Sequence, residues 1–378
     1  KTLVSRILHL LQNRRIRPSE ITAVTFTNQA AQEIRMRLEK QLGGKRAVGK
    51  LSIGTFHSLC YENLKNSDTG FALADEEMVL ELIKEIKEEM GLKESPNTLR
   101  QAISKEKTRV SEEIWQTKNE QARLSHESES LANIDQITAR YQERLAEWEL
   151  MDFDDLLLQA LYQAEETKPR FPYLLVDEFQ DISPLQYRLI QAWIKGSREV
   201  FIIGDPDQAI YGFRGAASEC FQQFCLEEQA QVIRLRKNYR STPEILIASR
   251  TVLKKEEPPL EPVMKSGLPV RLICAANEMG EAIATAKEIN RLVGGIDMLD
   301  AQEGAACQSS FTPRSFGDMA VLYRTHRQAG ILETCLKKEG IPYIVAGREE
   351  FLQEDCIRGS LGFFRSLIHP EHDIWKTM

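Results

Sequence analysis

Hydrophobic and polar positions divide this chain into short apolar runs separated by longer stretches of helical periodicity. Four of the apolar runs have the length of a β-strand: Ile21–Phe26, Leu51–Phe56, Tyr173–Val176 and Glu199–Gly204. A run such as Tyr173–Val176, with no polar residue, is typical of a strand that is buried on both faces of a parallel sheet. The alternation of strands with helices predicts an α/β fold whose parallel strands are joined by right-handed crossovers.

The helical stretches differ in character along the chain. Leu3–Leu11 has the periodicity of a helix, and Thr27-Asn28 can cap a second helix that reaches Leu42. From about residue 75 to residue 164 the pattern is helical and acidic, without a confident strand signal, and it predicts an inserted helical subdomain. Ser183-Pro184 combines an N-cap residue with proline at the first helical position, and Thr242-Pro243 repeats this combination.

A second α/β unit is expected in the last third of the chain. Its strands are predicted at Val270–Cys274, Met319–Tyr323 and Ile341–Val345. Helical stretches lie near 278–293 and 327–339, and a last helix is expected at Phe351–Ile368. The segment Gly294–Gly317 is rich in Gly, Ser, Gln and Asp, which favours a mobile loop.

The composition is that of an ordinary globular protein with two to three domains: 42% of the 378 residues are hydrophobic and 28% are charged. No apolar run approaches the length of a membrane span, so no membrane partner is expected. The seven cysteines form no Cys-x-x-Cys pair, which favours buried thiols in a reducing cytoplasm over disulfides or zinc.

Charge is distributed unevenly along the chain. The net charge is −7, but residues 1–66 carry +8 and the remainder −15. A basic segment in an acidic protein can bind a polyanion locally. A solvated helix face would explain Arg35, Arg37 and Lys40 equally well.

Two adjacent carboxylates, Asp177 and Glu178, follow the apolar run Tyr173–Val176 directly. Open α/β sheets bind ligands at the carboxyl ends of their strands. The pair therefore suggests one acid that faces Mg²⁺ and a second that orients a water molecule. The alternative is a strand that simply runs into an acidic turn.

The stretch from Gly204 to Ala216 is the most specific motif of the chain. It follows a strand and contains Gly, Asp, Gln, aromatic residues and Arg within one loop. Gln208 is placed to contact a phosphate or its attacking water, and Phe213 and Arg214 could stack on and clamp a nucleic-acid strand.

Five motifs in the same order resemble the UvrD/Rep/PcrA-like superfamily 1 DNA helicases. They are Ala23–Asn28, Gly54–Ser58, Val176–Asp181, Gly204–Ala216 and Asn238–Ser241. The resemblance implies a P-loop NTPase with two RecA-like parallel-sheet domains and an inserted all-helical subdomain. Residues 1–66 and 165–232 would form the first RecA-like domain, 67–164 the helical subdomain and 233–378 the second RecA-like domain.

The resemblance also assigns a nucleotide site with ATP and Mg²⁺. Lys1 would contact the β- and γ-phosphates, because Lys-Thr at the start of a helix is how a P-loop ends. Thr2 would be a hydroxyl ligand of Mg²⁺, Asp177 would hold the metal through water, and Glu178 would polarise the hydrolytic water.

Three further residues complete that site by resemblance. Gln208 would sense the γ-phosphate, and Arg240 would reach it from the second domain as an arginine finger. Tyr239 would stack on adenine. For each of these residues the alternative is a solvated charge or a packed aromatic ring.

The residues expected along single-stranded DNA are Phe26, Thr27, Asn28, Thr55, His57, Tyr211, Phe213 and Arg214. Aromatic side chains in such a site stack on bases of any sequence. Phe213 stands where several relatives have Trp, so an equivalent but weaker stack is expected. Phe26 could equally belong to the core, and His57 suits a phosphate contact or a helix-start hydrogen bond better than a metal.

Measured against the family, the chain begins inside the P-loop and stops before the last motor motifs. The strand expected before Lys1 is central in a RecA-like sheet, so its omission should leave two neighbouring strands without ladder partners. The chain is therefore expected to be a fragment of a longer helicase, with both RecA-like domains incomplete.

The expected function is an ATP-dependent helicase and translocase that moves 3′ to 5′ on single-stranded DNA, in repair, replication or recombination. Single-stranded and partly duplex DNA would be its partners, in the cytoplasm and near the nucleoid. Two alternatives stay open: a fragment that binds single-stranded DNA without hydrolysing ATP, and the motor of a RecB- or AddA-like helicase–nuclease.

Overall fold

The computed structural model describes residues 1–65, 71–118, 133–167, 171–210, 212, 219–254, 260–294, 313–346 and 355–368. The chain divides into two units, Lys1–Ile233 and Arg234–Met378. Each unit is described by itself below.

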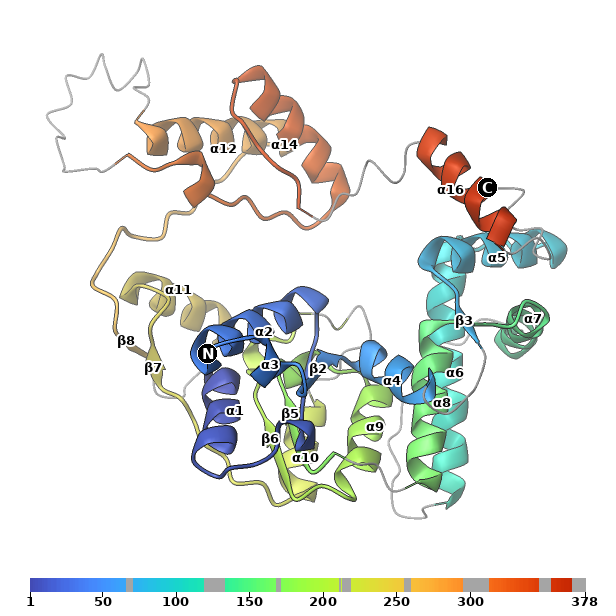
Figure 1. The fold of residues 1–378 in the computed structure, drawn as a ribbon. Coiled ribbons are helices and arrows are strands. Elements are labelled where there is room, and N and C mark those ends of the chain that lie inside the picture. The colour runs from blue at the N-terminus through green and yellow to red at the C-terminus, as the bar shows by residue number, and fades with distance from the viewer. Residues whose placement is uncertain are drawn as a thin grey trace, which may run out of the picture. The chain divides into compact units, whose positions relative to one another are not determined.

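A four-stranded parallel sheet forms the centre of the first unit (Figure 1). Its strands are β1 (Ile21–Thr25), β2 (Ser52–Thr55), β5 (Tyr173–Val176) and β6 (Glu199–Ile202), in the order β2-β1-β5-β6. Ala23 of β1 lies opposite Ile53 of β2 and Leu175 of β5, and Leu175 lies opposite Phe201 of β6. The four strands expected in this unit and the parallel α/β fold are confirmed.

Omission of a central strand was expected to leave two neighbouring strands without ladder partners, and this expectation was wrong. β5 pairs directly with β6 in a continuous register from Tyr173↔Glu199 to Val176↔Ile202. In the described part of the chain β6 lies at the edge of the sheet, and its four residues are half-buried, whereas those of β5 are all buried. Both β1 and β5 are therefore paired with a neighbouring strand on each side.

Helices cover both faces of the sheet because the residues of β5 alternate between two cores (Figure 1). Tyr173 and Leu175 pack with α1 (Thr2–Gln12) and α2 (Asn28–Leu42). Leu174 and Val176 pack on the other side. That side is covered by α4 (Phe56–Lys65), α8 (Phe153–Glu166), α9 (Pro184–Ile194) and α10 (Glu219–Glu227). The result is a three-layer arrangement in which all four β5 side chains are withdrawn from water.

The helix starts follow their expected chemistry with one exception. Thr27 caps α2 by accepting a hydrogen bond from the Ala30 N–H at 3.1 Å. Ser183 caps α9 through a reciprocal pair with Gln186. Thr242 precedes α11 (Pro243–Leu253) but makes no side-chain cap bond, so only the proline of the expected combination is used there.

The inserted segment is helical, as expected, and also contains a small strand pair. Its helices are α5 (Glu76–Glu89), α6 (Pro96–Lys118), α7 (Ile134–Glu147) and α8, which also packs on the sheet. The strands β3 (Ala72–Leu73) and β4 (Leu150–Met151) pair in parallel, which corrects the expectation of a strand-free insertion. Two-residue strands carry too little alternation to be seen in the sequence. The remaining short elements of this unit are η1 (Pro18–Glu20), α3 (Lys45–Val48), η2 (Phe179–Asp181) and η3 (Pro206–Gln208).

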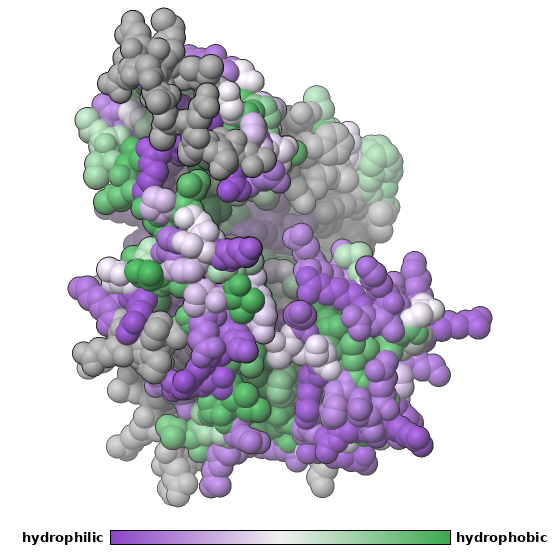
Figure 2. Space-filling view, turned by 90° about the vertical axis from the view of Figure 1, so that its left-hand side faces the viewer, coloured by the Kyte–Doolittle hydropathy of each residue, from purple (hydrophilic) through white to green (hydrophobic). Residues whose placement is uncertain are grey.

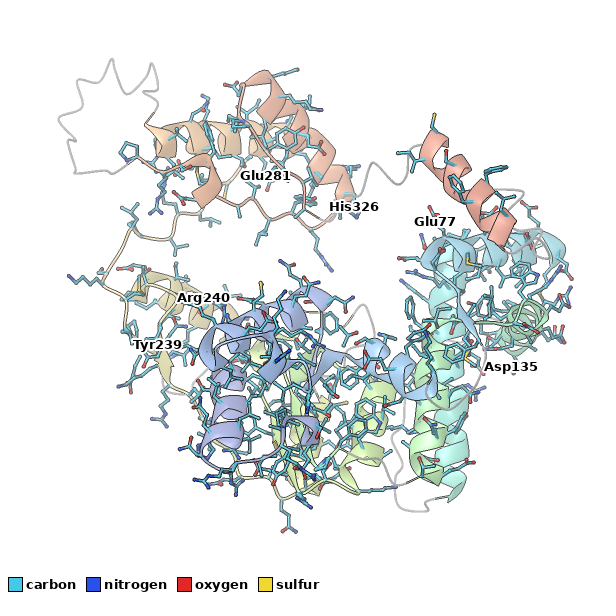
Figure 3. The ribbon with its side chains drawn as sticks, viewed as in Figure 1. Glu77, Asp135, Tyr239, Arg240, Glu281 and His326 are labelled. Atoms are coloured by element: carbon cyan, nitrogen blue, oxygen red, sulfur yellow. The ribbon has the colours of Figure 1, made fainter. Side chains whose placement is uncertain are left out.

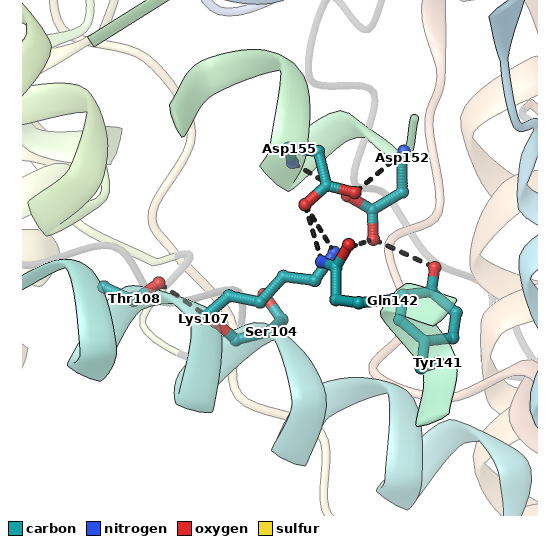
Figure 4. A network of polar contacts seen from close by, with 7 residues as sticks. All are labelled: Ser104, Lys107, Thr108, Tyr141, Gln142, Asp152 and Asp155. Atoms are coloured by element: carbon teal, nitrogen blue, oxygen red, sulfur yellow. Dashed lines mark hydrogen bonds and ion pairs between the residues drawn. The ribbon is translucent and has the colours of Figure 1, made fainter. Parts of the chain in front are cut away.

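A buried ion-pair network ties α6 and α7 to the start of α8 (Figure 4). The Lys107 Nζ lies 2.6 Å from Asp152 Oδ2 and 2.9 Å from Asp155 Oδ1, and its side chain is 3% exposed. Tyr141 Oη donates to Asp152 at 2.9 Å and Gln142 Nε2 donates to Asp155 at 2.8 Å. Burial alone would raise the pKa of Asp152, but the Lys107 ammonium holds it below its usual value.

The second unit contains α11, α12 (Glu278–Val293), α14 (His326–Lys338) and α16 (Asp355–Ile368), with η5 (Phe316–Asp318). α12 and α14 match the expected helices near 278–293 and 327–339, and they share a core of Ala286, Ile289, Leu336 and Ile341. The strands β7 (Lys237–Asn238) and β8 (Glu261–Pro262) pair in parallel. Residues 351–354, and most of the segment 294–317 in which a loop was predicted, lie outside the described residues.

The three strands predicted for this unit are not formed. Residues 270–274, 319–323 and 341–345 have no ladder partner in the described part of the chain. Leu272, Leu322 and Ile344 are 91%, 94% and 96% exposed. Apolar composition marks a segment as suited to a sheet, but a strand exists only where a neighbour pairs its backbone groups.

Apolar and polar residues both reach the surface of the molecule, as the space-filling view illustrates (Figure 2).

None of the helices in the described ranges combines the length and the apolar character that a bilayer span needs.

Replacing Lys107 with alanine tests the buried network. The change leaves the Asp152 and Asp155 carboxylates buried without their cation, which should cost about 3–5 kcal/mol. Hydrogen exchange of the α6, α7 and α8 amides measures that loss as reduced protection. Lys84→Ala is the control, because the exposed Lys84–Glu81 pair contributes about 1 kcal/mol or less. Equal protection in the two variants would contradict the assignment.

Candidate active site

The acidic pair is held by backbone hydrogen bonds that continue past the end of β5. The Asp177 N–H donates to the Val24 carbonyl at 2.9 Å, and the Phe179 N–H donates to the Ile203 carbonyl at 3.0 Å. The Ile203 N–H donates to the Val176 carbonyl at 2.8 Å. The carboxyl ends of β1, β5 and β6 are thereby fixed at one edge of the sheet.

Glu178 has a backbone conformation that few residues other than glycine adopt, with φ 51° and ψ 47°. Buried residues fix the chain on both sides of it, since Val176 and Phe179 are each 0% exposed. Phe179 makes edge-on contacts with Tyr187, Phe221 and Phe224. Glu178 itself is exposed. Strain of this kind persists where the surroundings over-determine it, and it is concentrated at functional sites.

Asp177 lies half-buried beside this turn. Burial raises the pKa of its carboxyl, and the negative charge of Glu178 raises it further. A backbone hydrogen bond from Glu178 opposes that shift.

The loop after β6 presents Gln208 at the same edge of the sheet. η3 begins after Asp205, whose carboxylate accepts the Asp207 N–H at 3.1 Å. The other carboxylate oxygen of Asp205 accepts the Gln208 Nε2 at 2.7 Å. Gln208 is exposed, and its amide becomes available to a ligand once its hydrogen bond to Asp205 is broken.

Lys1 and Thr2 stand at the exposed amino end of α1, with no side-chain cap. The first N–H groups of a helix favour anions, which suits the phosphate role expected there. Thr2 and Asp177 each carry a hard oxygen ligand. The described residues contain no group of three or more His, Cys, Asp or Glu side chains that could hold a metal. A two-ligand set fits Mg²⁺, which keeps several waters and shares phosphate oxygens.

The residues expected on DNA at the ends of β1 and β2 are also placed. Phe26 is half-buried, whereas Thr27 and Asn28 are exposed at the start of α2. Thr55 is fixed by Ser58, whose Oγ accepts the Thr55 N–H at 2.8 Å. Gly54 permits this turn, because a Cβ there would lie 2.4 Å from the Ser58 Oγ.

His57 is half-buried and meets Phe153 of α8 edge-on, with ring centroids 5.1 Å apart. Burial lowers the pKa of His57, so the neutral ring predominates at neutral pH. A neutral ring can still donate one N–H to a phosphate. Tyr211, Phe213 and Arg214 lie outside the described residues.

Tyr239 and Arg240 belong to the second unit, in the segment between β7 and α11 (Figure 3). The Asn238 Oδ1 accepts the backbone N–H of Arg240 at 3.0 Å and of Ser241 at 2.8 Å. Tyr239 is 68% exposed. Their expected approach to the acids of the first unit stays a prediction.

Comparison with known proteins shows two family matches that together span most of the chain. Residues 1–228 match the UvrD/REP helicase N-terminal domain, and residues 233–376 match the UvrD-like helicase C-terminal domain. The chain belongs to the UvrD/Rep helicase family. The resemblance drawn from the five motifs is thereby confirmed.

Individual relatives agree with this family. The chain is 32% identical to DNA helicase II of Escherichia coli (strain K12), over 99% of this chain and 51% of the relative. It is 32% identical to the ATP-dependent DNA helicase UvrD1 of Mycobacterium leprae, over 97% and 49%. It is 29% identical to the ATP-dependent DNA helicase PcrA of Bacillus subtilis (strain 168), over 100% and 51%. The chain thus spans about half the length of these relatives.

Asp177→Asn tests the electrostatics of the acid pair. Because the folded-state pKa of Asp177 is raised, its charged form opposes folding once the pH exceeds its ordinary value. Removing the charge should therefore raise the melting temperature at pH 8, and the gain should vanish below about pH 4, where the acid is protonated in both states. Thermal unfolding at the two pH values measures this, with exposed Glu62→Gln as control. A lower melting temperature for Asp177→Asn at pH 8 would sink the interpretation.

Proposed function

We propose that the protein is an ATP-dependent DNA helicase that moves 3′ to 5′ along single-stranded DNA. The observation that carries the proposal is the strained, fixed turn that presents Asp177 and Glu178 beside Gln208 at the carboxyl ends of the sheet. Family membership supports the use of a nucleotide there. Single-stranded DNA with an adjoining duplex is the proposed substrate, and opening of a 3′-tailed but not a 5′-tailed duplex would establish the direction.

Each residue has a chemical role in this proposal. Thr2 and Asp177 would hold Mg²⁺, which would supply positive charge for the phosphates of ATP, and Lys1 would add its own positive charge. Glu178 accepts a proton from the attacking water, and Gln208 contacts the terminal phosphate. Arg240 stabilises the charge that develops on that phosphate, and Tyr239 stacks on the base.

The DNA path is proposed along the ends of β1 and β2 and the loop after β6. The basic segment 1–66, with a net charge of +8, supports phosphate contacts by Thr27, Asn28, Thr55 and His57. Phe26, Tyr211 and Phe213 would stack on bases, with Arg214 clamping the strand. Closure of the two domains around ATP would alternate the grip on DNA and so produce steps.

Glu178→Gln in the full-length protein should lower DNA-stimulated ATP turnover by about 10²-fold or more, the contribution of a general base. Nucleotide binding should persist, because the amide keeps the size of the side chain. Steady-state turnover and equilibrium binding of a fluorescent ATP analogue measure the two effects. The exposed Glu62→Gln is the control. Near-normal turnover by Glu178→Gln would refute the role of Glu178 as general base. If the wild-type protein itself showed no ATP turnover, DNA binding without hydrolysis would be the remaining function.

Phe213→Ala should weaken binding of single-stranded DNA by the loss of one base stack, about 1–3 kcal/mol or about 5- to 150-fold in Kd. Fluorescence anisotropy of a labelled oligonucleotide measures the change. Phe213→Trp should bind at least as tightly as the wild type, because a larger ring stacks better. An unchanged Kd for Phe213→Ala would remove this residue from the DNA path.

A further inference from the structure

Gln180 is a buried polar residue that was not among the site residues predicted from the sequence. It lies in η2, directly after the acidic turn, and is 2% exposed. Its Nε2 donates to the Glu178 Oε2 at 2.8 Å, and its Oε1 accepts the backbone N–H of Asp205 at 3.0 Å. The two ends of one amide thus contact two different strand-end loops.

These contacts form part of a longer series of hydrogen bonds. Asp205, which donates its N–H to Gln180, also holds the side chain of Gln208 at 2.7 Å. The series therefore connects Glu178, through Gln180 and Asp205, with Gln208. In the sequence, the segment that begins at Gly204 is followed by Tyr211, Phe213 and Arg214, which are proposed to contact DNA. Gln180 is the connection between that loop and the acid proposed to activate water.

The packing around Gln180 leaves its amide little freedom. A Cβ on Gly204 would lie 2.7 Å from the Gln180 Oε1, 3.0 Å from Phe221 Cε2 and 3.2 Å from the Phe179 N. A glycine is therefore needed for the loop to approach this closely. On the other side the left-handed backbone of Glu178 sets where its carboxylate meets the Gln180 Nε2. A hydrogen bond to a charged acceptor is among the stronger ones.

We infer that Gln180 is a positioning residue that transmits the position of the DNA-contacting loop to the carboxylate of Glu178. DNA binding moves or fixes the loop at Gly204–Gln208. The change in position reaches the Gln180 amide through its hydrogen bond with the Asp205 N–H. The amide in turn orients the Glu178 carboxylate toward the attacking water. The inference rests on the proposed function. It assigns Gln180 no contact with ATP or DNA, so both affinities should be independent of it.

Two substitutions in the full-length protein separate this role from simple packing. Gln180→Met keeps the length of the side chain and removes both hydrogen bonds. Gln180→Glu keeps the acceptor for Asp205 but replaces the donor to Glu178 with a like charge. Gln191→Met is the matched control, because the Gln191 Nε2 also donates to a carboxylate, Glu227, at 2.7 Å.

The decisive measurement is the stimulation ratio, which is the steady-state ATP turnover with a single-stranded oligonucleotide divided by the turnover without it. Both Gln180 variants should lose at least about tenfold of the DNA-stimulated kcat, a part of the contribution of a general base. The DNA-independent turnover of Gln180→Met should stay within about twofold of wild type, below the effect of one lost hydrogen bond. The KM for ATP and the Kd for DNA should stay within the same limit in both variants. Gln191→Met should keep the full stimulation.

The pH profile provides the second readout. In Gln180→Glu the introduced carboxyl becomes a donor to Glu178 when it is protonated, so the stimulation ratio should recover as the pH falls. Gln180→Met has no such group, and its ratio should not recover.

Four results would overturn the inference. An unchanged stimulation ratio in both variants would show that the amide transmits nothing. A fall of basal and stimulated turnover by the same factor in Gln180→Met would leave only a packing role. The same conclusion would follow if Gln180→Met did not fold while Gln180→Glu folded and kept full stimulation. A wild-type protein without DNA-stimulated turnover would instead refute the proposed function, and the inference with it.

Discussion

The structure depends on the parallel ladder that joins β1, β5 and β6. Because this ladder continues beyond β5 through the N–H groups of Asp177 and Phe179, the chain cannot relax at the point where the acids emerge. The buried Phe179 fixes the next residue, so the strain of the turn falls on Glu178. A site made from short loops thereby acquires the rigidity of the sheet, which catalysis by fixed charges requires.

The same edge of the sheet carries the residues of both proposed sites. Asp177, Glu178 and Gln208 are proposed to act on a nucleotide, and the residues at the ends of β1 and β2 are proposed to contact DNA. The helical insertion adds to the second group, since Phe153 at the start of α8 packs on His57. The Lys107 network fixes that start and so supports the position of Phe153. Contacts of this kind explain how a helical insertion can influence a site that the sheet builds.

Much of the first unit could be predicted from sequence because its signals are local. The apolar run Tyr173–Val176, the cap at Thr27 and the Ser183-Pro184 start each depend on neighbouring residues only. The Lys107 network, the β3–β4 pair and the contacts of Gln180 depend on residues that the fold brings together from distant positions, and no periodicity reports them. In the second unit, Val270–Cys274 has the composition of a strand, but pairing is a tertiary property and the composition alone does not produce it.

The central proposal is that the acids of the first unit and Arg240 of the second act on one terminal phosphate. A crystal structure of the full-length protein with Mg²⁺ and a non-hydrolysable ATP analogue tests it most directly. The account predicts the γ-phosphate within hydrogen-bonding reach of Gln208 and Arg240, with Glu178 facing the position of the attacking water. A nucleotide bound elsewhere, or an Arg240 side chain directed away from the phosphate, would contradict it.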